Sequence, residues 1–156
     1  MIVLLVLILS LLAFRGLGAL GILAFATWMD STRFALAVMF LFTSLAHFNK
    51  MRHDLARMMP AAFSNRMAMV YFTGVCEILG AFGILITQTR SLAGLCLCLF
   101  LLCILPANIK AAREGLILGG RPATALWLRI TMQILFLVLI CWSTQPWQLF
   151  SFLLKS

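Results

Sequence analysis

The sequence has very little charge. Only 10% of its 156 residues are charged, whereas 64% are hydrophobic and the mean hydropathy is +1.12. Soluble domains are about half apolar and about a quarter charged, so this composition excludes an ordinary soluble domain. The stretches between the apolar runs are also too short to fold by themselves. We therefore expect an integral membrane protein whose principal partner is the lipid bilayer.

Acidic residues are the scarcest charged group. There are 4 of them against 12 basic residues, which gives a net charge of +8. In a soluble protein this excess would suggest a nucleic-acid partner. Here the basic residues stand at the ends of apolar runs, where the positive-inside rule and anionic lipid headgroups favour them. The sequence therefore argues against nucleic acid as a partner.

The cysteines lack the spacing of a disulfide scaffold or a metal site. None belongs to a CxxC motif, and no histidine stands at zinc-ligand spacing from them. We interpret them as small, soft residues that pack between helices. The alternative is that Cys96 or Cys98 meets Cys141, which the topology places in the same half of the membrane. The five positions are Cys76, Cys96, Cys98, Cys103 and Cys141.

Long apolar runs, by contrast, make up most of the chain. Five runs are long enough, or nearly so, to cross about 30 Å of hydrocarbon as helices. We expect an all-α transmembrane helical bundle, with the first run retained as a helix and interrupted only by Arg15. The runs cover 2–28, 34–49, 67–87, 92–109 and 123–142.

The basic residues predict the orientation of this bundle. The connections after the second and fourth runs, with the start of the fifth, hold eight basic residues, and the opposite side holds three. The positive-inside rule then places the N-terminus in the cytoplasm and the C-terminus on the opposite side of the membrane. Trp28, Trp142 and Trp147 would share the outer interface, with the tail 146–156 lying along it. The eight are Lys50, Arg52, Arg57, Arg66, Lys110, Arg113, Arg121 and Arg129; the three are Arg33, Arg90 and Lys155.

A GxGxxG pattern at residues 16–21 does not indicate a nucleotide site. A dinucleotide-binding loop follows a strand and opens a helix, with an acidic residue about twenty positions later. This pattern lies inside an apolar run, and Asp30 follows much too closely. Small residues that let helices approach explain it better.

Glu77 is the polar residue placed deepest in a predicted membrane helix. A charge there costs about 2.5–3.5 kcal/mol on insertion scales, so the side chain should face the bundle and have a partner. Thr73, Gly74, Gly80 and Ala81 stand three or four positions away, on the same face of a helix. This face is typical of a close helix contact, so we expect Glu77 to point inward.

Four more polar residues should lie in the cytoplasmic half of the bundle. They are His47, Asn108, Arg129 and Gln133. Together with Glu77 they are our candidate polar pocket, open toward the cytoplasm, for a ligand. The alternative is that they form interhelical hydrogen bonds that only fix the bundle, worth about 0.6–2 kcal/mol each.

The ionisation partner of Glu77 has three alternatives in the sequence. Glu77 could pair with Arg129, pair with Arg15, or stay protonated because it is desolvated. Our working hypothesis is the Glu77–Arg129 pair, since both residues are expected in the inner half of the membrane.

Several short motifs resemble the DoxX family of small bacterial membrane proteins. The resemblance runs from about residue 33 to residue 142 and implies a four-helix membrane bundle over 33–145. The first helix, 1–32, would be an addition to it. His47, Glu77 and Asn108 match positions of the family pattern. The motifs are Arg33-Phe34-Ala35, Ala46-His47-Phe48, Met58-Met59-Pro60, Thr73 to Glu77, Leu105 to Ile109, and Gly120-Arg121-Pro122 with Arg129 and Gln133.

The resemblance implies a loosely defined activity. DoxX members are linked to quinone-dependent sulfur oxidation, to complexes with soluble redox enzymes and, in distant relatives, to assembly of other membrane proteins. The expected role is an accessory protein of a redox or oxidative-stress system, with a quinone or lipid in the polar pocket. No haem, flavin or iron–sulfur motif is visible, so the chain is not expected to be an enzyme by itself.

Two other functions remain open from the sequence. The chain could be a non-catalytic assembly factor or subunit that packs against another membrane protein. A proton-coupled transporter is less favoured, because no inverted repeat and no pair of broken helices is visible.

Overall fold

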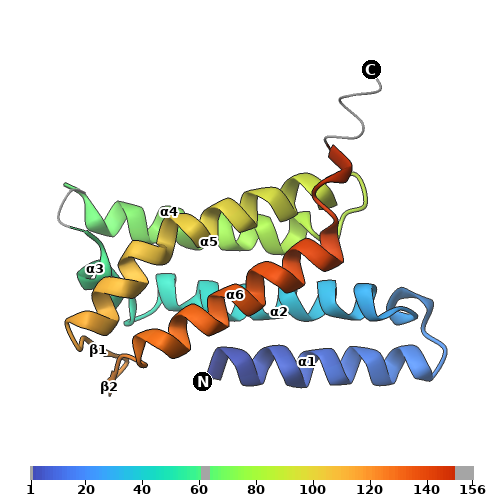
Figure 1. Cartoon of the computed structure of the whole chain (residues 1–156), viewed down its shortest axis with the longest axis horizontal. Coiled ribbons are helices and arrows are strands. Elements are labelled where there is room, and N and C mark those ends of the chain that lie inside the picture. The colour runs from blue at the N-terminus through green and yellow to red at the C-terminus, as the bar shows by residue number, and fades with distance from the viewer. Residues whose placement is uncertain (1, 61–63, 150–156) are drawn as a thin grey trace.

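The computed structural model describes residues 2–60 and 64–149, and these form an all-helical bundle with one small hairpin (Figure 1). Five long helices run up and down beside one another, and a short helix and the hairpin close one end. The elements in chain order are α1 (Ile2–Ala19), the 3-10 helix η1 (Leu23–Phe25), α2 (Trp28–Phe48), α3 (Arg52–Met58), α4 (Arg66–Gly83), α5 (Arg90–Arg113), β1 (Ile117–Leu118), β2 (Arg121–Pro122) and α6 (Leu126–Thr144).

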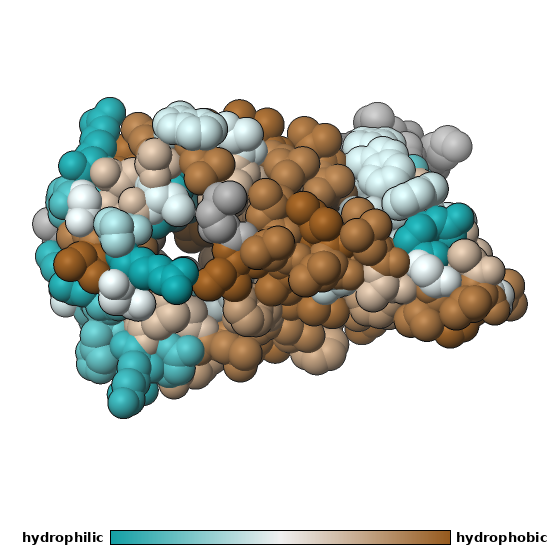
Figure 2. Space-filling model, turned by 90° about the horizontal axis from the view of Figure 1, so that it is seen from below, coloured by the Kyte–Doolittle hydropathy of each residue, from teal (hydrophilic) through white to brown (hydrophobic). Residues whose placement is uncertain are grey.

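The surface is polar at the ends and apolar between them. Figure 2 shows hydrophilic side chains gathered at the end that holds α3, β1 and β2, a smaller hydrophilic group toward the other end, and a hydrophobic belt between them. Four helices, α1, α2, α5 and α6, are long and apolar enough to cross a membrane. The prediction of a multi-pass membrane protein is confirmed at this level.

The first predicted run contains a break that we did not expect. α1 ends at Ala19, and α2 begins at Trp28, six residues before the predicted start of the second run. Gly21 has a φ of 95°, a conformation that glycine adopts at little cost, and it turns the chain. The Thr27 hydroxyl then caps α2 by accepting from the Asp30 N–H over 3.1 Å. Hydropathy could not show this, because the turn is built mainly from apolar residues.

The two basic connections meet at one end, as the predicted topology requires. α3 packs against α5 and β1, with Met58, Ala107 and Ala111 buried in a small second core. The Asp54 carboxylate accepts the Gly119 N–H over 2.8 Å and thus ties α3 to the hairpin. The short helix and the hairpin were not predicted from the sequence.

Asp54 lies outside the helices that could span a membrane, and its charge is stabilised there. The Gly119 N–H lowers the pKa of Asp54, and Arg57, which forms an ion pair with it, lowers it further. Lys110 Nζ donates to the carbonyls of Arg57 and Met59, both over 3.0 Å. Lys110 therefore binds the C-terminal end of α3.

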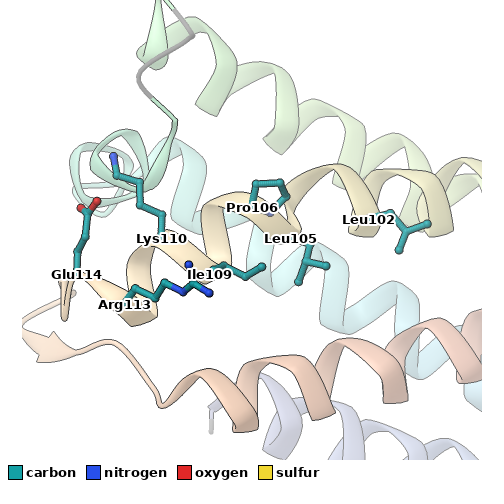
Figure 3. A pocket seen from close by; sticks show the side chains of 7 residues that line it. All are labelled: Leu102, Leu105, Pro106, Ile109, Lys110, Arg113 and Glu114. Atoms are coloured by element: carbon teal, nitrogen blue, oxygen red, sulfur yellow. The ribbon is translucent and has the colours of Figure 1, made fainter.

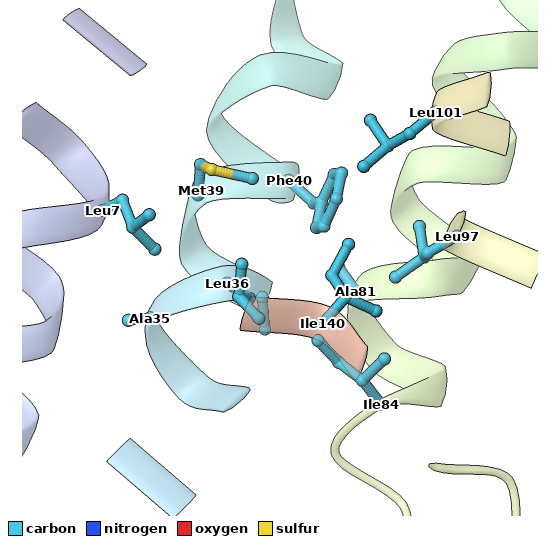
Figure 4. Packing of buried hydrophobic residues seen from close by; sticks show 11 residues of the cluster. Leu7, Ala35, Leu36, Met39, Phe40, Ala81, Ile84, Leu97, Leu101 and Ile140 are labelled. Carbon is cyan, nitrogen blue, oxygen red and sulfur yellow. The ribbon is translucent and has the colours of Figure 1, made fainter. Parts of the chain in front are cut away.

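The main core joins α2 to its neighbours. Figure 4 shows Leu36 and Phe40 of α2 among Ala81 of α4, Leu97 of α5 and Ile140 of α6, and all of these are buried. α1 packs chiefly on α2 and buries only Leu7. The helix with the most buried residues is α2, which lies between α1 and the rest of the bundle.

Candidate functional site

The first polar cluster joins the end of α2 to α4. Glu77 is buried, with 6% of its surface exposed, so the prediction that it points inward is confirmed. Its Oε1 lies 3.7 Å from Nε2 of His47, and its Oε2 lies 2.8 Å from the Thr43 hydroxyl. Nδ1 of His47 lies 2.7 Å from the Val70 carbonyl oxygen.

These distances decide how protons are arranged in the cluster. A carbonyl oxygen can only accept, so Nδ1 of His47 must carry a hydrogen toward Val70. Nε2 then faces Oε1 of Glu77, and both atoms are acceptors unless one of them holds a proton. Their separation of 3.7 Å is an ion-pair distance if His47 is protonated and is too long for a hydrogen bond.

Gly74 makes the approach of the two helices possible. A Cβ atom at this position would lie 2.6 Å from Cβ of His47 and 2.9 Å from its Cγ. Thr73, next to it, places its hydroxyl 3.1 Å from Nδ1 of His47. The cluster is thus closed by tight packing as well as by hydrogen bonds, and the predicted small-residue face of α4 is confirmed.

The second polar cluster joins α5 to α6. Nη1 of Arg129 donates to Oδ1 of Asn108 over 2.9 Å, and Nε of Arg129 donates to the Thr124 carbonyl over 3.2 Å. Nδ2 of Asn108 lies 3.5 Å from Oε1 of Gln133. The other end of the Gln133 amide donates to the Leu101 carbonyl. This cluster has one cation and two amides, and in the described part of the chain no carboxylate pairs with the cation.

Pro106 loosens α5 beside this second cluster. Proline has no N–H, so the carbonyl of Leu102, four residues earlier, lacks its usual partner within the helix. Leu102 lines the surface next to the buried amide of Gln133. The hollow that Leu102 and Gln133 line is nevertheless apolar, because neither the Leu102 carbonyl nor the hydrogen-bonded Gln133 amide exposes polar surface to it.

Two hollows adjoin along this surface. One, of about 240 Å³, lies between α5 and α6 and is lined by apolar side chains and Gln133. The other, of about 490 Å³, follows α5 to its basic end, where it includes Lys110 and Arg113 (Figure 3). They share Leu102 and Leu105, and we call them together the α5–α6 groove. The further residues are Pro106, Ile109, Glu114, Ile130, Ile134 and Leu137.

The five predicted pocket residues are thus divided between two contacts. His47 and Glu77 meet in one, and Asn108, Arg129 and Gln133 meet in the other, with no hydrogen bond or ion pair between the two sets among the described residues. Only Gln133 lines the groove. The expected pair of Glu77 with Arg129 is not formed, because α4 packs on α2 and α5 whereas α6 packs on α5 and α2.

Arg15, the other suggested partner of Glu77, lies elsewhere. Its Nη1 donates to the Ala26 carbonyl over 3.1 Å, and its guanidinium lies 5.2 Å from the Trp28 ring centre. Arg15 therefore holds the turn between α1 and α2 and not the polar pocket.

Other parts of the site could not be read from the sequence. The groove is lined mainly by leucine and isoleucine, and the sequence does not distinguish these from the other exposed apolar residues of the helices. Arg33 is buried, pairs with Asp30 and donates to the Ser143 carbonyl over 2.8 Å. The spacing of Asp30 and Arg33, one turn apart, was a usable signal for that contact.

The comparisons with known proteins give a family. No curated protein and no solved structure matches the chain. One family model, described as a domain of unknown function (DUF8561), matches residues 36–145. The match runs from within α2 to the end of α6 and leaves out α1. Because it covers well over half of the 156 residues, the chain belongs to the DUF8561 family.

Proposed function

We propose that the protein is a multi-pass membrane accessory protein that binds a quinone-like or lipid-like amphiphile in the α5–α6 groove. In this proposal α4 is a fifth membrane span, and the end with α3 and the hairpin faces the cytoplasm of a bacterial cell. The N-terminus is then cytoplasmic and the C-terminus outside.

The arrangement of α4 and of the basic residues supports this topology. α4 has 18 residues, as many as α1, and it packs along α2 and α5. It carries Arg66 at its first position and Glu77 inside, and Glu77 is paired with His47. A helix whose buried charge is paired can cross a bilayer beside its neighbours. The basic end matches the positive-inside rule.

The observation that carries the proposed ligand is the polarity gradient along the groove. At the basic end Arg113 is exposed and, in the described part of the chain, has neither an ion pair nor a hydrogen bond. Leu102 and Leu105 continue the groove, and Ile134 and Leu137 line its apolar end. An amphiphile has the same order of parts, with a polar head and an apolar tail.

The polar groups in the groove suggest how the head group would be held. A quinone carbonyl would have to replace the Leu101 carbonyl as the partner of the Gln133 amide, because the inner hollow is otherwise apolar. A quinone offers carbonyls, and a quinol offers hydroxyls. Arg113 would favour an anionic lipid head group instead. The resemblance to DoxX is our reason for including the quinone and a redox partner protein.

The test is mass spectrometry of the intact protein after gentle extraction, with a matched pair of variants. Ile134→Trp would fill the groove, whereas Leu79→Trp adds the same ring on α4, where Leu79 is 66% exposed and outside the groove. We expect the wild type and Leu79→Trp to retain one amphiphile and Ile134→Trp to lose it. Equal retention by all three, or by none, would contradict the proposal.

A second arm of the test separates the two ligand classes. Arg113→Gln should weaken retention of phosphatidylglycerol from nanodiscs and leave retention of a short-chain ubiquinone unchanged, because only the phospholipid is anionic. If the retained mass is a quinone, the redox role gains support. If it is an anionic phospholipid, the groove is a lipid site.

A further inference from the structure

Two of the five cysteines face each other between α5 and α6. Sγ of Cys98 lies 3.5 Å from Sγ of Cys141, although the two residues are 43 positions apart in the chain. Both side chains are half-buried. Each comes from a different helix, so chain connectivity alone does not bring them together.

The helices around this pair already lie very close. One turn before Cys98, a Cβ atom on Gly94 would lie 2.0 Å from the Thr144 hydroxyl oxygen. The Ser91 hydroxyl donates to the Thr144 carbonyl over 3.2 Å. A disulfide needs its sulfurs about 2.05 Å apart, with Cβ atoms about 3.8 Å apart. Turning the two side chains can supply most of this approach, because the helices are already in contact beside them.

The pair also stands at a defined place relative to the α5–α6 groove. Leu102 lies four residues after Cys98, and Leu137 lies four residues before Cys141; both line the groove. Residues four apart share a helix face, so the thiols lie one turn beyond the apolar end of the groove. Cys141 is also only three residues from the end of α6 at Thr144.

We propose that Cys98 and Cys141 are a redox-active dithiol that forms a reversible disulfide and locks α5 to α6 beyond the groove. Two S–H bonds break and one S–S bond forms. The two electrons and two protons pass to a small disulfide, which is cleaved into two thiols through a mixed disulfide. The position near the end of α6 gives such an oxidant a short path from the aqueous side opposite the basic end. This inference does not depend on the ligand proposed above.

The experiment uses the full chain in detergent, equilibrated with an oxidising glutathione buffer or reduced with dithiothreitol, and then alkylated with excess N-ethylmaleimide. After reduction, all five cysteines should be alkylated. After oxidation, three should be alkylated, and the intact mass should be about 2 Da lower before alkylation is counted. Digestion should yield a linked peptide that contains Cys98 and Cys141. In glutathione buffers, the ratio of disulfide to dithiol should follow oxidised glutathione divided by the square of reduced glutathione.

The variants make the assignment specific. Cys98→Ser and Cys141→Ser should each abolish the internal disulfide, while Cys96→Ser and Cys103→Ser, which change exposed neighbours on α5, should leave it intact. Alkylation of all five cysteines after oxidation, or a linked peptide in which Cys98 or Cys141 carries N-ethylmaleimide, would overturn the proposal. The readout is covalent, so it is independent of any loss of amphiphile from the groove.

Discussion

The two polar contacts of this bundle differ in how they accommodate polar side chains between helices. Between α2 and α4, His47 and Glu77 are buried and lie 3.7 Å apart, and Gly74 brings the helix backbones close. Between α5 and α6, Asn108 and Gln133 link through amides beside a proline, and the surface there is hollow. The first contact is tightly packed, whereas the second adjoins open volume.

This difference separates polar residues that hold helices together from polar residues that can meet a ligand. A buried ionisable group in a membrane protein is a functional candidate by default. Among the described residues, the buried His47 and Glu77 face each other, and the buried Arg33 pairs with Asp30. Gln133 lines the groove, and its buried amide is bonded to the Leu101 carbonyl. Our proposed binding site therefore follows accessible volume and not charge.

The largest expected effect comes from breaking the closed contact with Gly74→Leu. A side chain at this position meets His47 at 2.6 Å, so α2 and α4 cannot keep their spacing, and overpacking of this kind costs about 3 kcal/mol. The matched control is Gly16→Leu, since a Cβ atom at Gly16 has no neighbour within 4 Å. Thermal unfolding in detergent measures both variants. Equal melting temperatures would show that the α2–α4 contact is not tight.

Much of the bundle could be predicted from the sequence, but the pairing of its polar residues could not. Helix existence follows from hydropathy, and the inward direction of Glu77 follows from the small residues around it. Its partner depends on which helices are neighbours, and apolar runs of similar length do not reveal that. The turn at residues 20–27 was missed because hydropathy does not report a positive φ at Gly21.

The second prediction tests the partner of Glu77 by double-mutant cycles. Glu77→Gln removes the carboxylate that faces His47 and should cost about 2 kcal/mol. The cycle of Glu77→Gln with His47→Gln should give a coupling of about 1 kcal/mol, in the range of polar contacts between membrane helices. The cycle with Arg129→Gln should give a coupling near zero. A reversed result would restore the pair of Glu77 with Arg129.

A smaller loss of stability is expected in the open contact. Gln133→Leu keeps the size of the side chain and removes the bonds to Leu101 and Asn108, which should cost about 1 kcal/mol. The same variant should retain much less amphiphile after gentle extraction. Thr131→Val, which changes an exposed hydroxyl two residues away, is the control and should alter neither property. Retention unchanged in Gln133→Leu would remove the amide from the proposed site.

The smallest effect is expected outside the bilayer, at Asp54. The pKa of Asp54 in the folded chain lies below its ordinary value of 3.8, so its carboxylate stabilises the fold above that value. The stabilisation is lost as the pH falls through the lower, folded-state pKa. At neutral pH the wild type should exceed Asp54→Asn by about 0.5 kcal/mol, the size typical of exposed ion pairs. Melting temperatures of the two proteins should converge on acidification, and a constant difference would exclude this linkage.

The clamp that Arg15 places on the turn after α1 has a consequence for how the chain enters the membrane. Its guanidinium needs the carbonyls of Phe25 and Ala26 and the ring of Trp28, all of which are synthesised later than α1 itself. If α1 entered the lipid alone, its Arg15 guanidinium would have no partner there. We therefore expect α1 and α2 to enter the lipid together as a helical hairpin. The insertion of α1, which lies outside the region that the family model matches, would then depend on α2, most of which lies inside that region.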